Sequence, residues 1–191
     1  MLAFAYGNLP HVLCALLLIA RIGDIGTTYL VSPTLELEAN PIVRKFGWPF
    51  ALLTLGACLL PYVYMPLAVS ALVTFFLVSA SNAGKIWIVR TVGERAYAAA
   101  LLDVARRSTL SLALLGLSAS AFFVALAGGT ILLFYPSDDE WGFWLGLGVL
   151  LYAGATWFYG TLAMIRLFRR AARGPERVHI AHPPAPPGGG Q

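Results

Sequence analysis

Apolar residues occur along this chain in long runs, without the strict alternation of a half-buried strand or the narrow apolar stripe of a soluble helix. Five such runs are each near the roughly 20 residues that a helix needs to cross a bilayer. They cover about residues 12–31, 41–64, 66–88, 109–134 and 142–165. We therefore predict an all-α fold, a polytopic membrane helix bundle with five transmembrane helices in a single domain, residues 1–170.

Composition supports a lipid environment, since 59% of the residues are hydrophobic and 12% are charged. No basic run precedes the first apolar segment, so we expect a retained helix and not a cleaved signal peptide. Cys14 and Cys58 lack the spacing of a zinc or thioredoxin-type centre and are expected to be buried thiols, with a disulfide between them as the minor alternative. We predict no metal and no cofactor.

Basic residues gather at one side of the predicted bundle. They are Arg44, Lys45, Arg90, Arg95, Arg106, Arg107, Arg166, Arg169, Arg170, Arg173 and Arg177. The opposite side has an uncharged turn at 61–66 and an acidic turn at 138–140. The positive-inside rule then predicts the N-terminus outside and the C-terminus in the cytoplasm. The net charge of +4 follows from this topology, so the expected partner is the lipid bilayer and no nucleic acid is implied.

Two segments are expected to lie outside the bilayer. Residues 90–107 mix apolar and charged side chains, which fits either a helix on the membrane surface or a solvated extension of the third membrane helix. Residues 171–191 form a Pro/Gly-rich cytoplasmic tail that cannot bury apolar surface, and we predict that it is disordered.

Small residues recur at four-residue spacing in the last two apolar runs. They are Gly116, Ser120, Ala121, Ala125 and Gly129 in the fourth helix, and Gly142 and Gly146 in the fifth. Such spacing lets membrane helices approach closely. We predict that these two helices pack together, and that they are also the route to a protein partner or a homo-oligomer.

Charged residues inside the first apolar run are the main candidates for a functional site. Arg21, Asp24 and Thr28 share one helix face, and Asp24 lies about 20 Å into the membrane if the helix starts near His11. Asn82 and Lys85 lie at a similar depth in the third helix. We predict a buried polar cluster of these five residues, in which Asp24 balances one or both cations.

The loop after the first helix has two interpretations. Asn40 followed by Pro41 is a standard helix start, with the Asn side chain capping free amides. Alternatively, Glu38 and Asn40 turn inward to meet Asp24. In that arrangement Asp24 and Glu38 become the candidate catalytic acid and base.

Asp24-Ile25-Gly26-Thr27-Thr28, Glu38-Ala39-Asn40-Pro41 and a later Asn82 together resemble a bacterial integral-membrane domain family of unknown function, over about residues 11–90. Its members typically show an Asp-x-x-Thr-Thr pattern late in the first helix, a Glu-x-Asn-Pro element opening the second, and an Asn in the third. Members often also carry a Lys in the second membrane helix, whereas residues 46–64 here have none. The resemblance implies a multi-pass protein of the bacterial cytoplasmic membrane and no particular reaction.

Three function hypotheses remain. The favoured one is a small, non-catalytic integral membrane protein that is a scaffold or accessory subunit of a membrane complex. The second is an intramembrane or interfacial enzyme acting on a lipid-linked substrate through Asp24 and Glu38, although the chain shows none of the common metalloprotease or serine-hydrolase motifs. The third is a proton or small-solute carrier that works as an oligomer. A sealed polar cluster favours the first, and a cluster open to a cavity favours the others.

Overall fold

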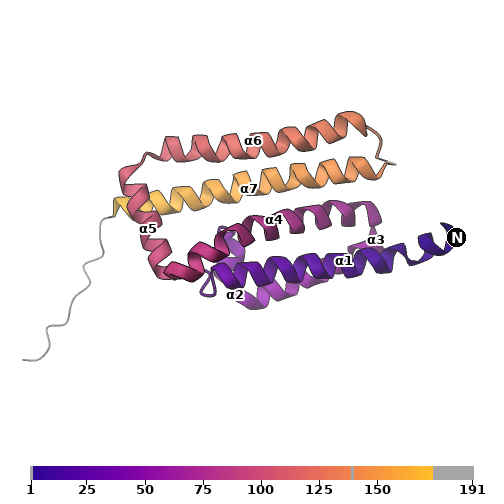
Figure 1. Ribbon diagram of the computed structural model, residues 1–191, viewed down its shortest axis with the longest axis horizontal. Helices are drawn as coiled ribbons and strands as arrows, with labels where there is room; N and C mark the ends of the chain where they lie inside the picture. Colours follow the sequence, from indigo (N-terminus) through magenta and orange to yellow (C-terminus); the bar gives the residue numbers. More distant parts are fainter. Residues whose placement is uncertain (1, 139, 174–191) are drawn as a thin grey trace, which may run out of the picture.

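The computed structural model describes residues 2–138 and 140–173, with side chains from residue 8 onward, and every regular element in this part of the chain is helical (Figure 1). Five segments of it are long and apolar enough to span a membrane, which confirms the predicted all-helical bundle. They are Asn8–Val31, Pro41–Val63, Met65–Val92, Leu110–Phe134 and Trp141–Ala172.

The first and last spans extend further than the apolar runs. Helix α1 covers Leu2–Val31 and continues through Pro10, although we expected its start near residue 12. Helix α7 covers Trp141–Ala172, about two turns beyond the predicted end at residue 165. The first residues of the predicted tail are therefore helical, and residues 174–191 lie outside the described part.

The second span is interrupted. It consists of helix α2 (Pro41–Leu53), a 3-10 segment η1 (Thr54–Leu59) and the short helix α3 (Leu60–Val63). Within α2, Gly47 has φ 72° and ψ −163°, a conformation that glycine adopts without a Cβ clash, and Pro49 follows it. The predicted second span is therefore present, but it is not the one continuous α-helix that we expected over 41–64.

Asn40 performs the capping role expected of it. Its Oδ1 accepts a hydrogen bond from the backbone amide of Ile42 at 2.9 Å, and Pro41 occupies the first helical position. The carboxylate of Glu38 accepts from the backbone amide of Asn40 at 2.7 Å. The loop thus closes on itself at the start of α2.

Within the segment 90–107, residues 90–92 end the third span and residues 94–107 form a separate helix. Helix α4 (Met65–Val92) ends at Gly93, whose φ of 86° breaks the helix, and α5 (Glu94–Arg107) follows. Figure 1 shows α5 running across the end of the bundle, from α4 on one side to α6 on the other. Glu94 fixes its start, because its carboxylate accepts from the Ser32 hydroxyl and from the Thr34 backbone amide at 3.3 Å. We call this side of the bundle the α5 end.

The described spans pack in a row (Figure 1). Helix α6 (Leu110–Phe134) packs against α7, α7 packs against α4, and α4 packs against α1. The second span lies beside α1. Helix α6 is an edge helix, because its extensive contacts within the described residues are with α7 alone.

Glycines set the closest approaches of α7 to its neighbours. A Cβ on Gly146 would lie 3.0 Å from the Gly128 carbonyl oxygen, and a Cβ on Gly128 equally close to the Gly146 carbonyl oxygen. A Cβ on Gly148 would lie 2.8 Å from the Ser70 carbonyl oxygen of α4. Backbones at this separation leave no room for a side chain, as at other close membrane-helix crossings.

Some of the predicted packing residues lie in helix contacts, and others do not. Ala121 and Gly146 lie in the α6–α7 contact, and Gly142 packs against the Tyr135 ring. Gly116 and Gly129 were assigned wrongly, because a Cβ on either would meet open space.

Neither of the two remaining predicted packing residues is buried. The side chain of Ser120 is exposed, and that of Ala125 is half-buried. The α6–α7 crossing lies at Gly128, one residue from the predicted position.

Candidate functional site

Asp24 and Arg21 form an ion pair inside the bundle. Asp24 is 7% exposed, and one of its carboxylate oxygens accepts from an Nη atom of Arg21 on the preceding turn of α1. The two residues are three positions apart, which places them on the same helix face. This pairing provides the buried carboxylate with its counter-charge within a single helix.

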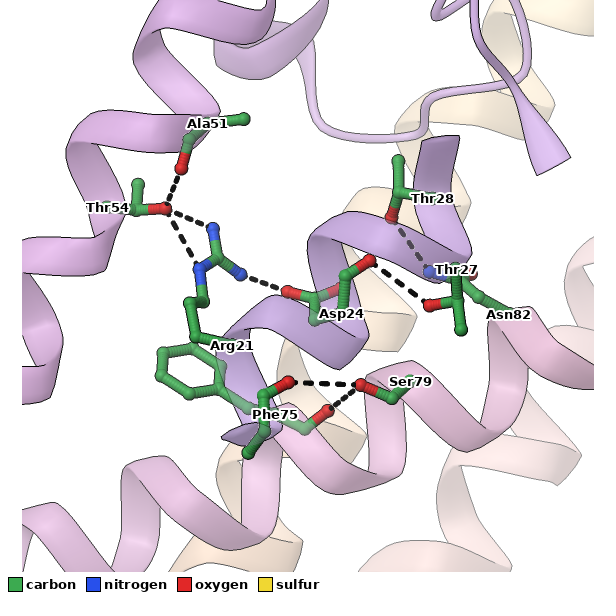
Figure 2. Close-up of polar contacts among 10 residues, drawn as sticks. Arg21, Asp24, Thr27, Thr28, Ala51, Thr54, Phe75, Ser79 and Asn82 are labelled. Carbon is green, nitrogen blue, oxygen red and sulfur yellow. Dashed lines mark hydrogen bonds and ion pairs between the residues drawn. The ribbon is translucent and has the colours of Figure 1, made fainter. Parts of the chain in front are cut away.

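The rest of the Arg21 guanidinium is held by two other elements, as Figure 2 shows. Its Nε donates to the Thr54 hydroxyl of η1 at 2.9 Å, and a second nitrogen donates to the same oxygen. The guanidinium carbon also lies 4.9 Å from the centroid of the Phe75 ring of α4, a distance suited to a cation–π contact. Arg21 therefore joins α1, η1 and α4.

Two polar side chains of α4 bind α1 near this pair without touching the Asp24 carboxylate (Figure 2). The Asn82 amide nitrogen donates to the Thr28 hydroxyl at 3.0 Å. The Ser79 hydroxyl donates to the Ala20 carbonyl at 3.3 Å and to the Phe75 carbonyl at 2.9 Å. The Asn82–Thr28 and Ser79–Ala20 bonds join α4 to α1, whereas the Ser79–Phe75 bond lies within α4.

Lys85 does not belong to the cluster. Its side chain is exposed, and it forms no ion pair or hydrogen bond with Asp24 or with any other described residue. Thr54 of η1, which we had not predicted for the cluster, accepts hydrogen bonds from Arg21. Sequence reasoning missed Thr54 because threonine in an apolar run carries no charge signal.

The buried charges of the cluster are paired with each other. Among the described residues, no buried side-chain nitrogen or oxygen lacks a hydrogen-bond partner. Glu38 lines a cavity whose lining does not include Asp24, and the two carboxylates form no hydrogen bond with each other, although the charge of Glu38 acts on Asp24. The two candidate catalytic carboxylates therefore interact through their charges without direct contact, and their role as an acid–base pair stays a prediction.

The cavity beside Glu38 is a second polar site, at the α5 end. It measures about 160 Å³ and lies between the loop after α1, the first turn of α2, α5 and the last turns of α7. Its charged lining consists of Glu36, Glu38, Arg44, Arg166 and Arg170, and we call it the arginine cavity. These arginines were interpreted from the sequence only as markers of orientation, and their convergence depends on how α2 and α7 meet.

The described part of the chain holds no group of three His, Cys, Asp or Glu side chains that could bind a metal ion. Cys14 and Cys58 are free thiols, so the disulfide alternative is not formed in this structure.

The fold and these sites define the class: five apolar spans around a buried ion pair indicate a multi-pass membrane protein. Comparisons of the chain with protein-family models, curated proteins and solved structures found no match.

Proposed function

We propose that this protein is a non-catalytic scaffold or accessory subunit of a membrane complex. The observation that carries the proposal is that its buried charges are paired with each other and bonded to neighbouring elements. Arg21 and Asp24 neutralise each other, and Thr54 accepts two further hydrogen bonds from Arg21. Charges held in this way join the helices around them.

The exposed face of α6 is where we propose that a partner helix binds. Helix α6 lies at the edge of the row of helices, and its Gly116 and Ser120 are exposed and unused by α7. Small residues four positions apart permit close approach of another membrane helix. We had predicted association through both α6 and α7. The proposal keeps α6 alone, through Gly116 and Ser120, which do not take part in the α6–α7 crossing.

We also propose that the α5 end faces the cytoplasm in a bacterial inner membrane. Support comes from the charges at that end, where Arg90, Arg95, Arg106 and Arg107 flank or belong to α5, and Arg169 and Arg170 end α7. The turn between α6 and α7, at the opposite end, includes Asp138 and Glu140. This distribution agrees with the positive-inside rule.

Association through α6 is tested by comparing Ser120→Leu with Ser111→Leu. Both serines are exposed on α6, and nine residues, or two and a half helical turns, place them on opposite faces. After extraction in a mild detergent, the apparent mass of the complex is measured by size exclusion with light scattering. We expect wild type and Ser111→Leu to form the same assembly and Ser120→Leu to dissociate. A wild-type protein that is strictly monomeric with no co-purifying chain contradicts the proposal.

A further inference from the structure

The arginine cavity brings together three guanidinium groups from two separate elements. Arg44 lies in the first turn of α2, and Arg166 and Arg170 lie one turn apart near the end of α7. The positive charges of Arg44 and Arg170 both act on Arg166, and the negative charge of Glu38 offsets them in part. Like charges held close together are unfavourable unless an anion compensates them.

Protein groups within the described chain orient these arginines without fully neutralising them. Arg166 donates from Nε to the Leu162 carbonyl at 3.1 Å and from an Nη to the Ala39 carbonyl, and neither acceptor carries a formal charge. Arg44 and Arg170 form no ion pair and no side-chain hydrogen bond with any described residue. Their donors are therefore available to a ligand.

The charge of the lining indicates the charge of that ligand. Three arginines and the carboxylates of Glu36 and Glu38 leave a net single positive charge when all five groups are ionised. A phosphodiester carries a single negative charge and offers oxygens to the planar donor fork of arginine. Its binding would make the cavity electrically neutral.

The cavity also has an apolar wall and a position at the end of the membrane spans. Leu37, Leu101 and Leu167 are part of its lining, and α5, which contributes Leu101, crosses the ends of the spans (Figure 1). A volume of about 160 Å³ is several times the roughly 30 Å³ that one water molecule occupies in the liquid. This space suits a headgroup phosphate, with the acyl chains outside along the apolar helices.

We propose that the arginine cavity binds the phosphodiester of an anionic phospholipid headgroup. Arg44 and Arg170 supply the donors, Arg166 supplies a fixed positive charge, and the apolar wall receives the glycerol end of the lipid. Basic pockets between membrane helices are a recurring form of anionic lipid site. This inference concerns a different surface from the α6 face and does not depend on the scaffold proposal.

The test uses neighbouring residues as matched controls. Arg44→Gln with Arg170→Gln removes two charges from the lining, and Lys45→Gln with Arg169→Gln removes two charges one residue away, from exposed side chains outside the lining. The full chain in maltoside micelles is titrated with phosphatidylglycerol, and bound lipid is counted by native mass spectrometry. We expect the cavity variant to lose at least about tenfold in affinity, and the control variant less than about twofold.

Several outcomes overturn the proposal. An equal loss in both double variants assigns the binding to overall charge, and an unchanged affinity in a folded cavity variant removes the site. If the double cavity variant fails to fold, the exposed single substitution Arg170→Gln is compared with Arg169→Gln under the same criteria. In a separate arm, inorganic phosphate is titrated against bound phosphatidylglycerol. If inorganic phosphate displaces phosphatidylglycerol at a concentration equal to that of the lipid, the cavity is a site for free phosphate and the lipid site is refuted.

Discussion

Gly148→Ala tests whether α4 and α7 meet backbone to backbone. At this position an added methyl group would lie 2.8 Å from the Ser70 carbonyl oxygen, 2.9 Å from the Ser70 Cα and 2.9 Å from the Val73 Cβ. Two hydrogen bonds cross the same contact. Ser70 donates to the Trp144 carbonyl at 2.7 Å, and Thr74 donates to the Gly148 carbonyl at 3.2 Å. Backbone atoms cannot rotate away as a flexible side chain can, so the helices must separate.

The size of the effect follows from that separation. Moving the contact from 2.8 Å to about 3.4 Å, where ordinary van der Waals contact begins, is a shift of about 0.6 Å. The same shift would lengthen the Thr74 bond beyond hydrogen-bonding range. Overpacking of this kind costs about 1–3 kcal/mol, and an interhelical hydrogen bond in a membrane contributes about 0.6 kcal/mol. The favourable helix propensity of alanine opposes these terms by up to about 1 kcal/mol.

Gly154→Ala is the matched control. Gly154 lies on the same helix, α7, and a Cβ there would meet nothing within 4 Å. Both substitutions gain the same helix propensity, so their difference isolates the contact. We expect Gly148→Ala to be less stable than Gly154→Ala by about 1.5–3.5 kcal/mol in free energy of unfolding. The assay is reversible unfolding in mixed micelles by sodium dodecyl sulfate, followed by circular dichroism. Equal stability of the two variants, within about 0.5 kcal/mol, would refute the close α4–α7 contact.

Three further substitutions are measured in the same unfolding assay. Asp24→Asn leaves the Arg21 charge buried without its partner and should lower the unfolding free energy by about 3 kcal/mol. Adding Arg21→Met should recover part of that loss, and a strictly additive double-mutant cycle would show that the two residues are not coupled. Asn40→Ala removes the cap of α2 and should cost about 1 kcal/mol, whereas Asn40→Asp should retain most of the stability. Gly93→Ala places a Cβ at φ 86° and should cost about 1–3 kcal/mol, but Gly84→Ala, inside α4, should cost nothing.

The membrane spans were predictable because the length of an apolar run is a local property of the sequence. The expected segments 66–88 and 109–134 correspond to Met65–Val92 and Leu110–Phe134 in the structure. The interruption of the second span had a local signal too, because Gly47 and Pro49 stand two residues apart in it. Hydropathy alone cannot detect such an interruption, since a 3-10 segment can be as apolar as an α-helix.

The candidate site was only partly predictable. The Arg21–Asp24 pair follows from a three-residue spacing within one helix, which is again local. Lys85 was placed wrongly because depth alone does not determine contact. Asn82 of α4 lies level with Thr28 of α1. Three residues later α1 ends, at Val31, and α4 has reached Lys85, so Lys85 is at the limit of the α1–α4 contact. The position of the crossing at Gly128 likewise depends on the rotation of one helix against another, which four-residue spacing leaves open.

The charged residues of the bundle fall into two sets at different depths, and we assign a structural role to the deeper set and a binding role to the other. Asp24 and Arg21 lie within the first span, where an unpaired ion is costly, and they are accordingly paired with each other. Arg44 and Arg170 lie near the α5 end, where α2 begins and α7 ends, and they lack a partner among the described residues. An unpaired cation is tolerable at an interface because water and lipid headgroups compensate it there. Exchange of a ligand is therefore expected at the arginine cavity, and the Arg21–Asp24 pair is expected to hold the helices in register.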